Sequence, residues 1–250
     1  MCGLNGLVLG SGAEMVPELR AELMTRLLSI GEARGRHATG VAIVDETGEA
    51  VVIKRPERGR LFVTRPEVQT ALREPGARII LGHNRFATRG HWLNPDNNHP
   101  IIAGTIIGTH NGTIDNADKL FRKHRLTRRG EVDSELIFRL AEKSLTRGRL
   151  GLLRFARYTR QLSGSLTVAM INLGEPGQMV MVKGDQPLTI KYSSSLDALA
   201  YASTEMALDY GLKAGADWRV VPMPYMTLAI FKRDNLSSPE YRAIEYEVVE

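Results

Sequence analysis

Hydrophobic and polar positions in the first half of the chain follow two spacings, one typical of strands and one typical of helices. Runs typical of strands cover 2–10, 39–45, 50–55 and 77–85. Leucines at helical spacing predict a helix over 17–35 that ends at Gly31 or Gly35. The turn segment ETGE between the second and third runs predicts a hairpin. Two further short strands are expected in 101–112, on either side of Gly104.

The second half of the chain groups its expected helices together. Helices are predicted at 116–125, 132–147 and 149–161. Runs typical of strands then occupy 165–173, 178–184, 188–193, 198–203, 225–233 and 243–250. Helices collected between two groups of strands imply helices packed on sheets, and an α+β fold in the form of an αββα sandwich of two antiparallel sheets between helical layers fits this order. Without an internal repeat or a low-complexity linker, residues 1–250 are expected to form a single domain.

The chain is mildly basic. The chain has 33 Lys and Arg against 28 Asp and Glu, a formal charge of +5. Arginines gather in 122–129 and again at Arg147, Arg149, Arg154, Arg157 and Arg160. Nucleic acid is compatible with this pattern as a partner but is not favoured, because no aromatic residues are interleaved for base stacking. A solvated helix face is the preferred interpretation.

The remaining composition excludes several classes of protein. No run approaches the roughly 20 apolar residues of a membrane span, and the beginning lacks the basic region of a secretory signal. We therefore expect no membrane association and a cytoplasmic location. Six histidines without a ligand spacing such as HExxH argue against a catalytic metal, and no cofactor is expected. A single cysteine forms no internal disulfide, which suits a reducing compartment.

That one thiol, Cys2, is the most informative residue. Because residues 2 and 3 are small, Met1 is expected to be removed, which leaves a chain that begins with cysteine. A thiol is a strong nucleophile, and a free α-amine with a reference pKa near 8 accepts its proton and passes it to a leaving amine. The alternative is that Cys2 is an ordinary small apolar residue on a first strand.

Five further motifs weigh against that alternative. They are RGRHATG at 34–40, GHNRFATRG at 82–90, NNHP at 97–100, HNGTIDN at 110–116 and VDSE at 132–135. Together with the initial CGLNG, these motifs resemble those of the class II glutamine amidotransferases, a branch of the N-terminal nucleophile hydrolases. Their order and spacing agree with the family over most of the chain.

The resemblance implies glutamine as the substrate and a role for each matched residue. Cys2 is implied as the nucleophile, with Asn111 and Gly112 as the oxyanion hole. Arg85 is implied to bind the substrate α-carboxylate and Asp133 its ammonium. Four nearby or supporting residues complete the expected site: Phe86 and Thr88 beside the clamp arginine, and His99 and His110 as structural hydrogen-bonding groups. Arg34 is expected to order the N-terminal region.

Each assignment has a simpler alternative that the residues leave open. Asn111 and Gly112 also form a strong hairpin signal, and Asp133 also fits the N-cap of a helix. An arginine such as Arg85 on a glycine-flanked loop is often a surface ion pair. At the level of function, a free glutaminase, an N-terminal nucleophile amidase for another amide and a non-catalytic regulatory module stay open beside the amidotransferase.

The sequence also departs from the family pattern. His37 and Ala38 stand where an acidic or hydroxyl pair is usual, Phe86 replaces a common Trp or Tyr, and Arg89 replaces a common His. Family enzymes often continue into a synthase domain, whereas this sequence stops at Glu250. A separate synthase or acceptor enzyme is therefore the expected partner, and a homo-oligomer stays open.

Overall fold

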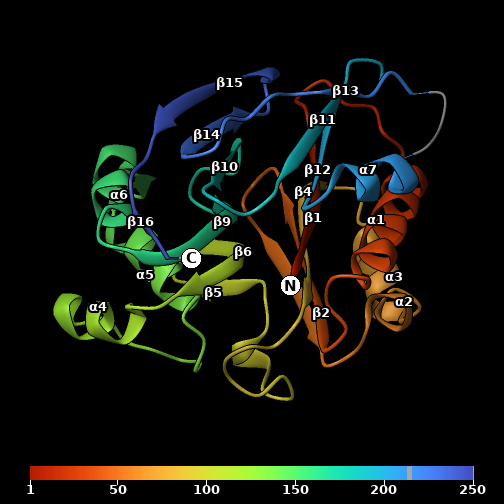
Figure 1. Ribbon diagram of the computed structural model, residues 1–250. Helices are drawn as coiled ribbons and strands as arrows, with labels where there is room; N and C mark the ends of the chain where they lie inside the picture. The colour runs from red at the N-terminus through yellow and green to blue at the C-terminus, as the bar shows by residue number, and fades with distance from the viewer. Residues whose placement is uncertain (213–215, 250) are drawn as a thin grey trace.

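Two β-sheets face each other in the computed structural model, which describes residues 1–212 and 216–249 (Figure 1). The first sheet has the strand order β13-β11-β12-β1-β4-β2-β3. Its strands are β13 (Arg219–Val220), β11 (Thr189–Ser193), β12 (Ala198–Ala202), β1 (Gly3–Leu9), β4 (Ala77–Arg85), β2 (Ala38–Asp45) and β3 (Ala50–Arg55). All of these pairs are antiparallel, so neighbouring strands begin at opposite ends of the sheet.

The second sheet has the order β15-β14-β10-β9-β6-β5, and β16 adds to β9 in parallel. Its strands are β15 (Asn235–Ala243), β14 (Thr227–Lys232), β10 (Gln178–Lys183), β9 (Ser163–Asn172), β6 (Ile106–Ile114), β5 (Ile101–Ala103) and β16 (Glu247–Val248). A separate hairpin consists of β7 (Leu145–Thr146) and β8 (Arg149–Leu150).

Helices cover the outer face of each sheet (Figure 1). The first sheet carries α1 (Pro17–Gly31), α2 (Gly59–Phe62), α3 (Pro66–Leu72) and α7 (Glu205–Gly211). The second carries α4 (Ala117–His124), α5 (Glu135–Lys143) and α6 (Leu152–Thr159), and the 3-10 helix η1 (Pro95–Asn97) lies in the loop between β4 and β5. The predicted four-layer αββα arrangement is confirmed.

Three layers of buried apolar side chains hold these elements together. One layer fills the space between the two sheets, with members such as Leu4, Leu81 and Ile107, all at most 2% exposed. The other two lie between each sheet and its helices. Each fully buried aliphatic side chain contributes roughly 1.5–3 kcal/mol. Because β1 belongs to the first sheet and β6 to the second, the middle layer sets the position of one relative to the other.

The predicted elements of the first half are confirmed, whereas three in the second half were wrong in extent. The helix predicted over 149–161 begins at Leu152, because Arg149 and Leu150 form β8. The helix predicted over 132–147 ends at Lys143, because Arg147 and Gly148 adopt positive φ angles of 52° and 77° and turn the chain into the β7–β8 hairpin. Within the strand predicted over 243–250, β16 covers only Glu247–Val248, and Glu250 lies outside the described residues. Strand β15 was not predicted, since its exposed edge position and Pro239 remove the usual apolar pattern.

The chain enters the fold between the two sheets, where Figure 1 places the N-terminus. Strand β1 pairs with β12 on one side and β4 on the other, so it is central in its sheet. Across residues 1–212 and 216–249, none of the helices combines the length and apolar character that crossing a membrane requires.

Candidate active site

Cys2 lies just before β1 and contacts the residue that follows β4. The antiparallel register pairs Gly3 with Asn84, which places Cys2 opposite Arg85 and close to Phe86, the next residue. The Phe86 N–H donates to Cys2 Sγ at 3.2 Å, and the thiol donates to the Phe86 carbonyl at 3.4 Å. The sheet register therefore positions the sulfur.

Burial raises the pKa of the Cys2 thiol above its ordinary value. The hydrogen bond from Phe86 and the nearby positive charges of the N-terminus and two arginines act in the opposite direction but are smaller. The thiol is therefore protonated at neutral pH. A nucleophile in this state needs a base within reach before it can attack.

Two donors hold the main chain of Cys2 in place. Arg34 Nε donates to the Cys2 carbonyl at 2.7 Å, and Asn111 Nδ2 donates to the same oxygen at 3.0 Å. The predicted ordering role of Arg34 thus corresponds to a direct contact with the first residues. Because Asn111 lies on β6, this carbonyl joins the two sheets.

Asn111 and Gly112 lie side by side on β6, as the HNG motif requires. The second hydrogen of Asn111 Nδ2 is donated to Ser203 Oγ at 2.9 Å, while its buried Oδ1 has no hydrogen-bond partner among the described residues. Gly112 has φ +133°, and a Cβ there would approach the Ser165 carbonyl to 2.0 Å. Only glycine fits at this position.

A cavity of about 290 Å³ opens in front of these groups. The predicted residues that line it are Cys2, Arg34, Phe86, Thr88, Asn111 and Gly112, and the others are Met1, Thr113, Ser165 and Gln186. The volume suits a ligand of amino-acid size. Since Met1 forms part of its wall, removal of Met1 would enlarge the opening beside the thiol.

Arg85 and Asp133 are both buried but do not line this cavity. Arg85 donates to Asn98 Oδ1 at 2.7 Å, to the Gly90 carbonyl at 2.9 Å and to the Arg89 carbonyl. Asp133 accepts from the Ile114 N–H at 2.6 Å. In this state the guanidinium orders the loop after β4, so the expected contacts with substrate charges stay a prediction.

Comparison with known proteins places this geometry in a family. No family model matches the chain. A glutamine–fructose-6-phosphate aminotransferase of Aeropyrum pernix is 33% identical over 207 residues, which are 80% of this chain and 32% of that protein. The chain belongs to the class II glutamine amidotransferases. These are enzymes of the N-terminal nucleophile hydrolase type.

Solved structures agree on the fold. The allosteric regulatory enzyme of purine biosynthesis matches with a TM-score of 0.73 at 18% identity, over 98% of this chain and 49% of that one. A class II glutamine aminotransferase domain protein from Silicibacter pomeroyi matches with a TM-score of 0.55 at 14% identity, over 98% of this chain and 99% of that one. The chain spans about a third of the length of the first curated relative, so the activity of that whole protein does not transfer directly.

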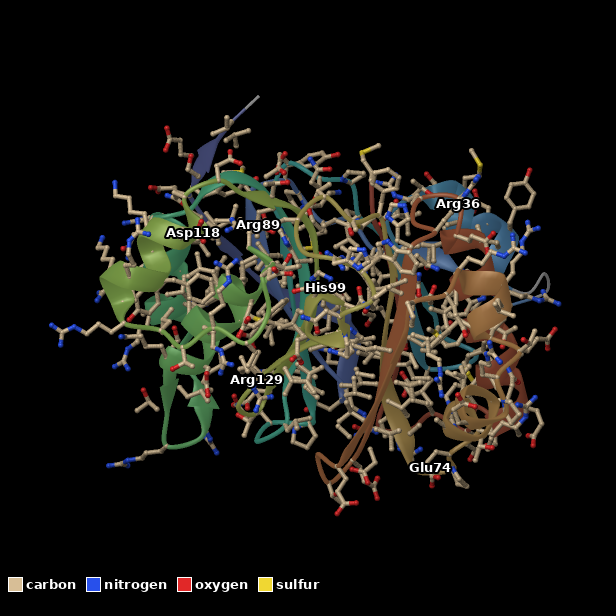
Figure 2. All side chains as sticks on the ribbon, turned by 90° about the horizontal axis from the view of Figure 1, so that it is seen from below. Arg36, Glu74, Arg89, His99, Asp118 and Arg129 are labelled. Carbon is tan, nitrogen blue, oxygen red and sulfur yellow. The ribbon has the colours of Figure 1, made fainter. Side chains whose placement is uncertain are left out.

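Two departures from the family have a structural explanation in this class II amidotransferase. His37 Nδ1 accepts from the Ala87 N–H at 2.9 Å, and its ring stacks on Phe86 at 4.8 Å between centroids. Arg89 pairs with Asp118 at 2.8 Å, and the two lie next to each other in Figure 2. Both residues therefore fix the loop that carries Phe86 and Thr88.

Sequence reasoning missed four polar residues of the site. Thr113, Ser165 and Gln186 line the cavity, and Ser203 accepts from both Asn111 and the Leu4 N–H. Thr113 directly follows the HNG motif, so strand alternation could have placed it near the site. The other three come from distant segments without a motif of their own.

Three histidines form a buried group behind the site, and Figure 2 shows His99 in the middle of the molecule. His110 contacts Ser134 Oγ at 2.8 Å through Nδ1, and His83 Nε2 lies 3.1 Å from the His110 carbonyl. His99 packs on His83 at 4.2 Å, and neither of its ring nitrogens has a hydrogen-bond partner among the described residues. Burial lowers the pKa of each, that of His83 to about 3, so all three are neutral at pH 7.

This group predicts a loss of stability in acid. An unfolded histidine has a pKa near 6.5, so below about pH 6.5 the unfolded chain binds more protons than the folded one. The free energy of unfolding should therefore fall as pH decreases below about 6.5, by up to roughly 1.4 kcal/mol per pH unit for each histidine that stays neutral in the folded chain, and for His83 this fall continues toward pH 3. Urea unfolding at pH 7, 6, 5 and 4 measures this slope.

A matched pair of variants isolates the contribution of burial. His99→Leu should flatten the slope, whereas replacing the exposed His91 by leucine should leave it unchanged. Equal slopes in both variants would contradict the assignment to the buried group.

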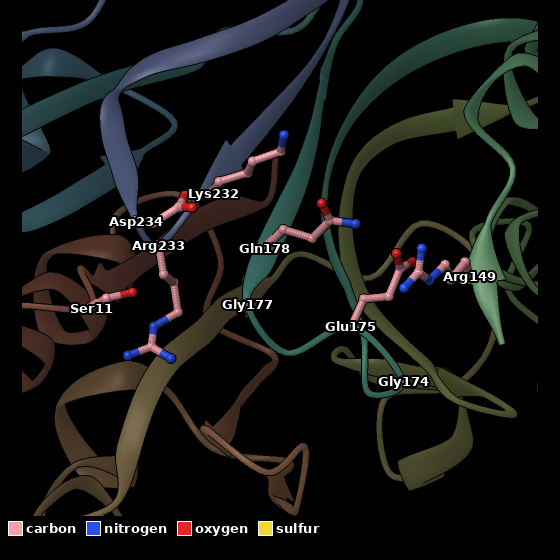
Figure 3. A pocket seen from close by; sticks show the side chains of 9 residues that line it. All are labelled: Ser11, Arg149, Gly174, Glu175, Gly177, Gln178, Lys232, Arg233 and Asp234. Atoms are coloured by element: carbon pink, nitrogen blue, oxygen red, sulfur yellow. The ribbon is translucent and has the colours of Figure 1, made fainter.

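A second cavity, of about 410 Å³, lies at the other end of β1, where Ser11 follows the strand (Figure 3). Figure 3 shows Lys232 and Arg233 pointing in opposite directions. Lys232 pairs with Glu240 at 2.5 Å, and Arg233 donates to the Leu9 carbonyl at 2.8 Å. Lys232 and Arg233 are thus both engaged with the protein itself, and we assign no ligand to this cavity. The described part of the chain also holds no group of three or more His, Cys, Asp or Glu suited to a metal ion.

Proposed function

We propose that this amidotransferase hydrolyses the side-chain amide of glutamine through Cys2 and makes the ammonia available to an acceptor. One observation carries the proposal. A single cavity brings together the thiol of Cys2 from the first sheet and Asn111 with Gly112 from the second. This is the pairing of nucleophile and oxyanion donors that acyl transfer requires.

The reaction proceeds in two halves. Cys2 Sγ attacks the amide carbon of glutamine, the thiol proton passes through the α-amine to the departing nitrogen, and ammonia leaves a γ-glutamyl thioester. Water then attacks the thioester carbon, which releases glutamate and restores the thiol. Asn111 Nδ2 and the Gly112 N–H stabilise the oxyanion of both halves. Because both hydrogens of Asn111 Nδ2 are engaged in this structure, one of them has to be shared with the oxyanion.

The base in this mechanism is the α-amine of Cys2. The raised pKa of the thiol requires a base, and the hydrogen bonds of Sγ among the described residues involve only the main chain of Phe86. Removal of Met1 places an amine on the same residue as the thiol. Its reference pKa near 8 suits proton transfer at neutral pH.

Displacing this amine is expected to slow the reaction. A chain with one alanine inserted between Met1 and Cys2 keeps the thiol but moves the amine one residue away. Glutamate release should fall by at least about 100-fold, the usual contribution of a positioned base. Steady-state glutamate release measures the effect, and intact mass identifies the first residue of each chain. Full activity in the inserted chain would refute the role of the amine.

A separate acceptor enzyme is proposed as the partner, since the motifs of this chain concern glutamine alone. The loop after β4 offers a means of coupling, because it carries Phe86 and Thr88 into the cavity and is held by side-chain contacts of Arg85. Docking of a partner on this loop would order it over bound glutamine. Hydrolysis that no acceptor changes would instead favour a free glutaminase.

A further inference from the structure

Part of the wall of the cavity comes from the β10–β11 loop and β9, and the lining residues from these two segments do not belong to the family motifs. Gln186 in this loop and Ser165 on β9 both line the cavity with Cys2. Gln186 donates from Nε2 to Asp185 Oδ2 at 2.9 Å, and its main-chain carbonyl accepts from Thr167 Oγ1 at 2.7 Å. Its Oε1 has no hydrogen-bond partner among the described residues and is available to accept.

A hydrogen-bonded pair, the half-buried Asp185 and the buried Tyr246, fixes this loop. The Tyr246 hydroxyl donates to Asp185 Oδ1 at 2.5 Å and accepts from the Asp185 N–H at 2.8 Å. The same carboxylate oxygen accepts from the Leu166 N–H at 2.7 Å. These hydrogen bonds outweigh burial and hold the pKa of Asp185 below its ordinary value, so the carboxylate stays charged.

Tyr246 itself is anchored by the last strand. It is 8% exposed within the apolar layer under α4 to α6, and the next residue begins β16, which pairs Glu247 with Ser163 of β9. Gly184 makes the close approach feasible, because a Cβ there would lie 2.3 Å from the Tyr246 oxygen. The C-terminal segment thus braces the cavity wall that Gln186 forms.

We propose that Gln186 is a substrate-contacting residue, whose Oε1 accepts a hydrogen bond from an N–H group of glutamine, and that Tyr246 and Asp185 position it. This inference rests on the proposed function. It adds a side-chain acceptor to the wall of the cavity, which Asp133, the residue implied to bind the ammonium, does not line.

The test compares three variants in the full chain. Gln186→Met keeps the length of the side chain but removes its acceptor. Tyr246→Phe removes only the hydroxyl that holds Asp185. Tyr241→Phe is the matched control, because the Tyr241 hydroxyl also donates to the protein, at the Pro222 carbonyl, but lies on β15 away from the cavity.

Gln186→Met is expected to raise KM for glutamine by about 10-fold to 100-fold with little change in kcat, the effect of a lost ground-state contact. Tyr246→Phe should raise KM in the same direction by less, and Tyr241→Phe should leave it unchanged. Alkylation of Cys2 by iodoacetamide should proceed at the same rate in all four chains, which excludes a general collapse of the site. Thermal unfolding verifies that each variant is folded.

A substrate analogue identifies the N–H group involved. Glutaric acid monoamide has the side-chain amide but lacks the ammonium. If Gln186 contacts the ammonium, Gln186→Met has no effect on hydrolysis of this analogue, and if it contacts the amide, the effect persists.

The inference and the proposed function fail in different ways. An active native chain with the same KM in Gln186→Met, or a Tyr246→Phe variant no different from Tyr241→Phe, overturns the inference alone. A native chain that neither hydrolyses nor binds glutamine overturns both.

Discussion

Replacing Cys2 by alanine is expected to abolish glutamate release while leaving the affinity for glutamine close to that of the native chain. Removal of the nucleophile costs about 10⁴-fold or more in enzymes that form acyl intermediates. The fold should tolerate the change, because the hydrogen bonds of Sγ within 1–212 and 216–249 involve only the main chain of Phe86, and loss of such a contact costs about 1 kcal/mol. Steady-state glutamate release and calorimetry with glutamine measure the two quantities.

The uniqueness of this thiol provides the control. Cys2 is the single cysteine of the chain, so iodoacetamide labels one site, and bound glutamine should slow that labelling. Alkylated protein should match the alanine variant in its lack of turnover. Residual hydrolysis in the alanine variant would indicate a different catalytic residue.

Replacing Arg85 by alanine is expected to have the second largest effect, a rise in KM for glutamine of about 100-fold or more. Its guanidinium joins three acceptors of the loop after β4, and each hydrogen bond to a charged group contributes about 1.5–3 kcal/mol. Their loss releases the segment that carries Phe86 and Thr88. If the guanidinium also binds the substrate carboxylate, that contact is lost as well. Steady-state kinetics and thermal unfolding measure both parts.

Two further substitutions separate these contributions. Arg85→Lys keeps the charge but loses the planar fork, so it should restore stability only in part and affinity still less. Arg89→Ala removes a half-exposed ion pair with Asp118 from the same loop but keeps the three hydrogen bonds of Arg85, so it should raise KM far less than Arg85→Ala. An unchanged KM in Arg85→Ala would contradict the importance of the loop for glutamine.

Much of the fold could be predicted because its signals are local. The hairpin of β2 and β3 follows from a turn segment between two apolar runs, and α1 follows from leucines at helical spacing. The hairpin of β7 and β8 could not be predicted, since an arginine at positive φ has no sequence signature. Strand β15 lies on an exposed edge, where burial does not impose alternation.

The residues of the site also differ in whether local sequence signals could predict them. Cys2, Asn111 and Gly112 belong to short motifs, and the structure brings all three to one cavity. Gln186 and Ser203 reach the site only through sheet pairing and loop packing over long separations in sequence. No local sequence pattern therefore indicates that these two residues belong to the site. Arg85 was predicted to be a site residue, and its contacts with three loop acceptors depend on a loop conformation that spacing does not encode.

Because Cys2 belongs to one sheet and Asn111 to the other, the distance between nucleophile and oxyanion hole depends on the spacing between the sheets. Leu4, Leu81 and Ile107 set that spacing through their packing in the middle layer, although none of them lines the cavity. Interiors are close-packed, so a change of one methylene there shifts one sheet against the other by a fraction of an ångström. An oxyanion hole tolerates little such displacement. Substitutions among the apolar residues of this layer can therefore change the rate of amide cleavage while every polar residue of the site stays the same.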